Sequence, residues 1–113
     1  MRIRTEVSSS YINEEDHKIA MVANALAHPL RVALVRYLDE KDKGEGLDNF
    51  TCNKDLVKMF DDSQSTMSQH VKILKECGLF TTKNKDRFTL YYLNKELLQE
   101  FNEFFDSFNS EQK

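Results

Sequence analysis

Residues 63–78, which read SQSTMSQHVKILKECG, decide how the rest of the chain is interpreted. Wound as a helix at 100° per residue, the stretch places Met67, Val71 and Leu74 on one side. The opposite side carries short polar side chains and one cation, namely Ser65, Ser68, Gln69 and Lys72. Such a face suits a helix in a DNA major groove, where Gln pairs with adenine through two hydrogen bonds and Ser contacts bases or phosphate. The stretch is therefore predicted to be a helix with one buried side and one DNA-reading side.

Two short segments after this helix are predicted to pair as a β-hairpin. Residues 79–82 (LFTT) and 88–92 (FTLYY) are rich in aromatic and Thr side chains, which favour strands. Residues 83–87 (KNKDR) between them form a polar tip with three cations and one anion. A helix followed by a hairpin with a cationic tip indicates a winged helix-turn-helix, in which the wing follows the phosphate backbone while the helix reads bases.

The distribution of charge favours a nucleic-acid partner more than the total does. The net charge of the 113 residues is −3, which alone argues against DNA binding. Residues 63–95, however, hold six Lys or Arg and only two acidic residues, so the remainder of the chain is strongly acidic. A basic segment on an acidic body is expected to give an electrostatic footprint on one face. A locally basic hairpin without a partner is the alternative.

Length and composition predict one domain without a membrane span. The hydrophobic fraction is 40% and the charged fraction 31%, values typical of a globular protein. No run of about eighteen apolar residues is present, and the N-terminal residues lack the apolar core of a signal peptide, so we expect a cytoplasmic protein. The two cysteines fit a reducing compartment. We expect a flexible arm over 1–13, the domain over 14–108 and a tail over 109–113.

The remaining elements complete a mostly α fold with a small β-hairpin. Helices are predicted over residues 14–27, 30–38, 54–60 and 95–108, with Pro29 opening the second helix at its first turn. Residues 39–48 are predicted to be a charged loop, and residues 50–51 a short strand. Together with residues 63–78, these segments give a winged helix-turn-helix of five helices and a two-stranded wing.

The last helix carries a broad aromatic stripe that predicts a dimer interface. Four of the eight phenylalanines lie in this helix, and acidic residues cover its other side. Packing of the stripe within its own domain is the simpler reading, but a two-fold interface between the terminal helices is favoured. A dimer suits DNA, because two reading helices about 34 Å apart would meet successive major grooves of a palindromic site. The expected interface residues are Ile19, Val22, Leu26, Leu97, Phe101, Phe104, Phe105 and Phe108.

Two motifs give the chain a resemblance to the ArsR/SmtB family of bacterial winged-helix repressors. The first is the sequence ALAHPLR at residues 25–31, and the second is the helix sequence from Gln64 to Leu79. The similarity extends over about residues 14–108 and includes the spacing between the motifs and the following wing. The resemblance implies a homodimer that binds operator DNA, usually represses its own operon, and is released by a metal ion or another signal.

The residues that sense metals in this family are incomplete in the chain. One class has Cys-x-Cys before the recognition helix, where this chain has Cys52-Asn53-Lys54 and so only the first thiol. A lone thiol is a poor site for a soft metal. A second class uses acidic and His ligands on the last helix, which here contains no His. We therefore expect no metal and no cofactor, and the small effector stays unknown.

The expected DNA contacts divide between base reading and phosphate binding. Gln69 is the leading base-reading candidate, with Ser65 and Ser68 beside it, whereas Thr66, Lys72 and the wing cations are expected to contact phosphate. A solvated surface residue is the alternative in each case. The full predicted set is Gln64, Ser65, Thr66, Ser68, Gln69, His70, Lys72, Lys83, Lys85 and Arg87.

Two other functions remain open at this point. A thiol switch could use Cys52, which is expected to begin a helix, and Cys77, which is expected to be half buried. Two inert thiols are the simpler reading. A dimeric protein-interaction module without DNA binding is the other alternative, favoured by the acidic body and by Asp61 and Asp62 near the reading helix. An enzyme is not expected, since the chain has no phosphate-binding loop and no catalytic spacing.

Overall fold

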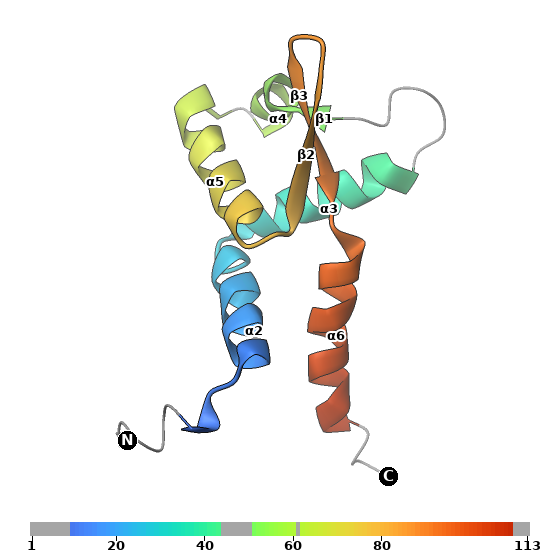
Figure 1. Ribbon diagram of the computed structural model, residues 1–113. Helices are drawn as coiled ribbons and strands as arrows, with labels where there is room; N and C mark the ends of the chain where they lie inside the picture. Colours follow the sequence, from blue (N-terminus) through green and yellow to red (C-terminus); the bar gives the residue numbers. More distant parts are fainter. Residues whose placement is uncertain (1–9, 44–50, 61, 110–113) are drawn as a thin grey trace.

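The computed structural model describes residues 10–43, 51–60 and 62–109 (Figure 1). The predicted fold class, a mostly helical winged helix-turn-helix with a β-hairpin, is confirmed. The predicted arm over 1–13 and tail over 109–113 lie largely outside the described residues. The helices and strands are, in order, α2 (Glu14–Ala25), α3 (Pro29–Lys43), β1 (Thr51–Cys52), α4 (Asn53–Phe60), α5 (Gln64–Glu76), β2 (Phe80–Lys85), β3 (Phe88–Leu93) and α6 (Lys95–Asn109).

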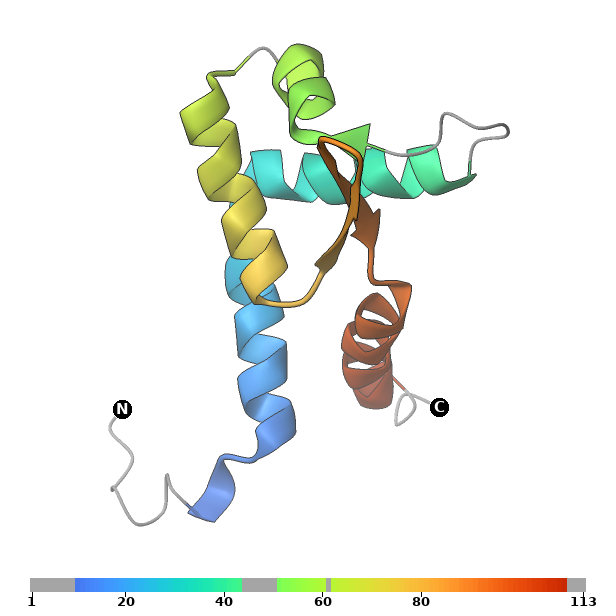
Figure 2. The same cartoon turned by 45° about the horizontal axis from the view of Figure 1, so that its top comes forward.

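Helix α3 crosses the middle of the molecule, and the other elements lie on either side of it (Figures 1 and 2). In Figure 1, the N-terminal end of α5, helix α4 and the tip of the wing lie at one end, and the N-terminal end of α2 and the C-terminal end of α6 lie at the opposite end. No single helix in the described residues is long and apolar enough to cross a membrane; α2 and α3 reach that length only as a pair bent by 98°.

Local hydrogen bonds fix the start of α2 at the predicted residue. The Asn13 side chain accepts a hydrogen bond from the backbone of Asp16 at 2.8 Å, and the Asp16 carboxylate accepts one from the backbone of Asn13 at 3.0 Å. This reciprocal cap satisfies two backbone donors at the helix terminus. Glu14, Glu15 and Asp16 also place negative charge in the first turn, where the helix dipole favours it.

Helix α2 ends at Ala25, two residues earlier than predicted, and α3 begins at Pro29 and runs five residues beyond the predicted end. The charged residues after Leu38 had indicated a loop, but charge does not break a helix, and Lys, Glu and Arg have high helix propensity. Two weak ion pairs accompany the extension: Arg36 with Glu40 at 4.0 Å, and Asp39 with Lys95 of α6 at 3.8 Å. The rest of the predicted loop lies outside the described residues.

The predicted two-stranded wing is part of a three-stranded antiparallel sheet with the order β1-β3-β2. Strand β1 covers Thr51 and Cys52, one residue later than predicted, and pairs Thr51 with Tyr91 and Cys52 with Leu90. The expectation that Cys52 begins a helix is therefore wrong, because its backbone is paired in the sheet and α4 begins at the next residue.

The wing strands are longer than predicted. Strand pairing continues to Lys83 opposite Leu90 and to Lys85 opposite Phe88, so the polar tip of five residues shrinks to a turn at Asp86 and Arg87. Polar residues had indicated a loop, but on an exposed hairpin they can pair through their backbones without apolar side chains. Asp86 has a φ of 57°, a left-handed conformation that Asp tolerates better than most residues.

The core joins α5 to every other helix and to the sheet. Its buried residues are Val22, Ala25, Leu34, Leu38, Leu56, Met67, Val71, Leu74, Leu79, Phe80, Tyr91 and Leu97. The predicted buried side of α5 is confirmed, because Met67, Val71 and Leu74 are at most 2% exposed. Burial of apolar side chains on this scale is the main favourable contribution to folding.

A polar joint connects the end of α5 to the start of α6. The backbone of Asn94 donates to the carbonyl of Leu79 at 2.8 Å, and its side-chain Nδ2 donates to the carbonyl of Gly78 at 3.0 Å. The Asn94 Oδ1 accepts from the backbone of Leu97 at 3.2 Å and thereby caps α6. Gly78 has a φ of +94°, which glycine adopts without strain, so the chain can turn sharply here into β2.

Candidate nucleic-acid interface

The outer face of α5 is polar and exposed, as predicted from its periodicity. Ser63 caps the helix, because its Oγ accepts from the backbone of Thr66 at 3.1 Å and donates to the Thr66 hydroxyl at 2.9 Å. The Asp62 carboxylate accepts from the backbone of Ser63 at 2.8 Å. Asp62 therefore helps to fix the backbone at the N-terminal end of α5. The exposed side chains of this face are those of Gln64, Ser65, Thr66, Ser68, Gln69 and Lys72.

The wing adds exposed cations at the same end of the molecule as the start of α5 (Figure 1). Lys83 lies on β2 with its ammonium nitrogen 5.8 Å from the centre of the Tyr92 ring. Arg87 is exposed in the turn. Lys85 belongs to β2, but its side chain lies outside the described residues. The geometry thus brings the N-terminal end of α5 and two predicted wing cations to one end of the protomer.

His70 has a setting different from that of the other predicted contacts on α5. Its ring is half buried, its Nδ1 lies 3.2 Å from Nη1 of Arg31, and its ring centre lies 4.7 Å from that of His28. Burial lowers the pKa of His70, and the positive charge of Arg31 and the neighbouring His28 act in the same direction. The half-buried ring is thus held by two neighbouring side chains of the protein, unlike the exposed side chains on the same helix.

The predicted dimer surface divides into exposed and buried residues. Phe105 and Phe108 are 49% and 57% exposed, and edge-to-face contacts at 5.2 Å link both rings to Phe104. Val22 and Leu97 are only 0% and 8% exposed, so they belong to the protomer core. Their prediction as interface residues is therefore wrong. The remaining predicted residues, Ile19, Leu26, Phe101 and Phe104, are half buried.

Comparison with known proteins identifies the family of the chain. The family model described as bacterial regulatory protein, arsR family, matches residues 28–82. An arsenical resistance operon repressor from Staphylococcus xylosus is 32% identical over 81 residues, which cover 68% of this chain and 78% of that repressor. The chain belongs to the ArsR family of bacterial regulatory proteins. It is accordingly a winged helix-turn-helix transcription regulator that binds DNA, not an enzyme.

Solved structures of similar proteins agree with this ArsR-family fold. A crystal structure described as a possible transcriptional regulator for arsenical resistance is 31% identical, with a TM-score of 0.61 over 76% of this chain and 81% of that one. A homodimeric winged helix-turn-helix DNA-binding domain from Mycobacterium bovis is 15% identical, with a TM-score of 0.59 over 100% of this chain and 94% of that domain. At 15% identity, the second similarity shows a shared fold and nothing more.

Of the two cysteines of this ArsR-family chain, only Cys77 has a described side chain. Cys77 is half buried, and its Sγ donates to the carbonyl of Leu74 at 3.4 Å. Burial raises the pKa of the Cys77 thiol, with nearby backbone hydrogen bonds opposing the effect. A thiol with a raised pKa is a weaker nucleophile at neutral pH. The side chain of Cys52 lies outside the described residues, so a thiol switch that uses Cys52 and Cys77 stays an untested alternative.

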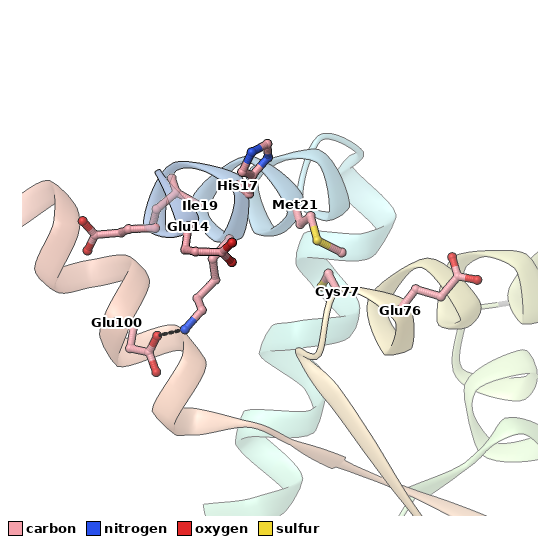
Figure 3. A pocket seen from close by; sticks show the side chains of 9 residues that line it. Glu14, His17, Ile19, Met21, Glu76, Cys77 and Glu100 are labelled. Atoms are coloured by element: carbon pink, nitrogen blue, oxygen red, sulfur yellow. Dashed lines mark hydrogen bonds and ion pairs between the residues drawn. The ribbon is translucent and has the colours of Figure 1, made fainter. Parts of the chain in front are cut away.

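A pocket of about 580 Å³ lies between α2, α6 and the end of α5 (Figure 3). Across it, Lys18 of α2 and Glu100 of α6 form an ion pair at 2.9 Å, the distance from Nζ to Oε1. Within the described residues, no three or more His, Cys, Asp or Glu side chains are placed to hold a metal ion. The pocket lining is Glu14, Glu15, His17, Lys18, Ile19, Met21, Glu76, Cys77 and Glu100.

Two residues of the interface region were absent from the predicted site. Arg31 and His28 both contact His70, although they lie about forty residues earlier in the chain. Both residues belong to the HPLR motif, which supports the family resemblance but did not predict this contact. The contact forms because the fold packs the corner between α2 and α3 against α5.

Proposed function

We propose that the protein is a homodimeric repressor that reads a palindromic operator upstream of its own gene, with one α5 helix in each half-site. The observation that carries this proposal is the exposed polar face of α5, whose N-terminal part lies at the same end of the protomer as the exposed cations of the wing. The arsenical resistance operon repressor similar to this chain supports the repressor function. A bacterial repressor binds its operator in the cytoplasm, so we propose that the protein is located there.

The side chains of the interface divide between two proposed tasks, base reading and phosphate binding. Gln69 reads a base through its amide, and Ser65 and Ser68 lie on the same exposed face within reach of neighbouring base edges. Thr66 and Lys72 contact phosphates, as do the wing cations. The hydroxyl of Thr66 already accepts a hydrogen bond from Ser63, but its own proton remains available for a phosphate oxygen.

Dimerisation through α2 and α6 is supported by the apolar surface that the protomer leaves exposed. Phe105 and Phe108 lie on the free end of α6, and Met21 on α2 is 50% exposed. The domain from Mycobacterium bovis with the same fold is homodimeric. A second copy would cover this surface and would place two α5 helices for two half-sites.

The test is fluorescence anisotropy on a labelled duplex from upstream of the gene, with a random duplex of the same length and a series of salt concentrations. Four cations per protomer, namely Lys72, Lys83, Lys85 and Arg87, give a slope of log K against log salt of at most about −7 for a dimer. Steep binding that prefers the upstream duplex is expected. Equal affinity for both duplexes, or no binding at low salt, would overturn the proposal and favour a protein-interaction module.

The variant Gln69→Ala tests the assignment of base reading. Loss of a bidentate base contact costs about 1–3 kcal/mol of discrimination in each half-site, so the preference for the upstream duplex should shrink while random-duplex binding is kept. Gln99→Ala on α6 is the matched control, since Gln99 is an exposed glutamine that lies on α6 rather than on the reading helix. Equal losses on both duplexes for Gln69→Ala would refute the assignment. The same assay with oxidant or metal ions added searches for the release signal.

A further inference from the structure

Three side chains form a polar link between α5 and the corner of α2 and α3. Arg31, from the first turn of α3, donates from Nε to the carbonyl of Ala25 at 2.7 Å, and its Nη1 lies 3.2 Å from Nδ1 of His70 on α5. The ring of His28 lies against that of His70, with centroids 4.7 Å apart and planes at 56°. One guanidinium therefore bridges the end of α2 and the middle of α5.

The hydrogen-bond partners assign the protons of the cluster. A guanidinium is always charged and can only donate, so Nδ1 of His70 must accept, and the ring is neutral with its proton on Nε2. Nδ1 of His28 likewise accepts from the backbone of Leu30 at 3.1 Å. A proton on Nδ1 of His70 would face the Arg31 donor and break the link.

A directional link matters here because the buried side of α5 packs through apolar side chains. Met67, Val71 and Leu74 hold α5 against the core, and hydrophobic burial has no preferred direction. A hydrogen bond weakens steeply as its angle departs from linear, so it resists rotation of the helix about its axis. Side chains at the helix surface lie about 5–6 Å from the axis, and a rotation of about 10° moves them by about 1 Å. Recognition requires placement within about 0.5 Å.

We propose that Arg31 and His70 are positioning residues that fix the rotation of α5 and so aim its polar face, instead of contacting DNA themselves. The inference rests on the proposed reading of operator DNA by α5. It also reassigns His70, which the sequence placed among the direct contacts. His28 supports the link by packing against the His70 ring.

The test compares variants by anisotropy on the upstream and random duplexes over a salt series. Arg31→Ala is expected to weaken upstream binding by about tenfold, the scale of one hydrogen bond to a charged group, with random binding and the salt slope nearly unchanged. Arg36→Ala is the matched control, because Arg36 is exposed on the same helix and carries the same charge. It should leave the preference for the upstream duplex intact.

A loss on both duplexes with the salt slope reduced by about 1.8 per dimer would instead make Arg31 a phosphate contact and overturn the proposal. Unchanged binding would overturn it too. If the wild-type protein shows no preference for the upstream duplex, the proposed function fails, which is a separate outcome read from the wild type alone.

Substitution of His70 keeps the test valid even if Arg31→Ala does not fold. The Asn side chain offers an acceptor close to the position of Nδ1, so His70→Asn should retain most of the preference that His70→Ala loses. Equal loss in both variants would contradict a role through the Arg31 link.

A pH series distinguishes this role from a purely structural one, because a purely structural residue would not make the preference for the upstream duplex depend on its protonation. Burial lowers the pKa of His70 below 6.5, with His28 and Arg31 acting in the same direction and Asp62 opposing them. The neutral ring is therefore fully present above pH 6.5, and the link is lost as the pH falls from 6.5 through the lowered pKa. The upstream preference of the wild type should fade over that range, and that of His70→Asn should fade less. An equal decline in both proteins would refute the inference.

Discussion

Replacement of Asn94 tests the joint between α5 and α6. The Asn94→Ala variant removes the hydrogen bond to the carbonyl of Gly78 and the cap on the backbone of Leu97, but it keeps the backbone bond to Leu79. Loss of the cap costs about 1 kcal/mol, and loss of the second hydrogen bond costs about 1 kcal/mol more. The free energy of unfolding should fall by about 2 kcal/mol, which lowers Tm by about 6–12 °C in a domain of this size.

The variant Asn94→Ser separates the two contributions. Serine caps helices well, but its short hydroxyl cannot reach the carbonyl of Gly78, so this variant should lose only about 1 kcal/mol. Urea unfolding followed by circular dichroism measures both variants, at one protein concentration because the proposed dimerisation would make stability depend on concentration. An Ala variant within about 0.5 kcal/mol of the wild type would refute the reasoning. Equal losses in the two variants would show that the cap contributes nothing.

Three further predictions concern the interface, the dimer and the thiol. Lys83→Ala should weaken binding to the upstream and random duplexes by the same factor and reduce the salt slope by about 1.8, because a dimer loses two cations. A changed sequence preference in the anisotropy assay would contradict a phosphate contact. Phe108→Ser should shift the protein toward monomers in sedimentation equilibrium, since this ring is 57% exposed in the protomer, and an unchanged dimer would place the interface elsewhere. In a Cys52→Ser background, Cys77 should react with iodoacetamide at pH 8 more slowly than free cysteine, because burial raises its pKa and lowers the thiolate fraction; an equal or faster rate would contradict this reasoning.

The elements with a strong apolar period were predictable from the sequence. Met67, Val71 and Leu74 recur at helical spacing, and a helix is the regular structure that places all three on one side. Ser68, Gln69 and Lys72 between them then have to face outward, and the structure leaves all three exposed, whereas His70 is half buried. The pattern determined the axis and the exposed face of α5 because hydrophobic burial dominates the energy of such a helix.

The parts that depend on contacts between distant residues were not predictable in the same way. The extent of α3 was underestimated because its last turns are charged, and the wing strands because their ends are polar. Neither sequence feature opposes backbone hydrogen bonding. The contact of Arg31 with His70 joins residues far apart in the chain, and no periodicity within either segment encodes it.

The placement of charge along the protomer has a consequence for the kinetics of binding. Glu14 and Glu15 on α2, and Glu103 and Asp106 on α6, lie on the helices that point away from the wing, whereas Lys83 and Arg87 lie at the wing end. In the field of a DNA duplex, such a molecule experiences a torque that turns the wing forward before contact, and the acidic end is repelled. Productive orientations are therefore enriched among diffusional encounters. Added salt should slow association more than it accelerates dissociation, because it removes this steering first.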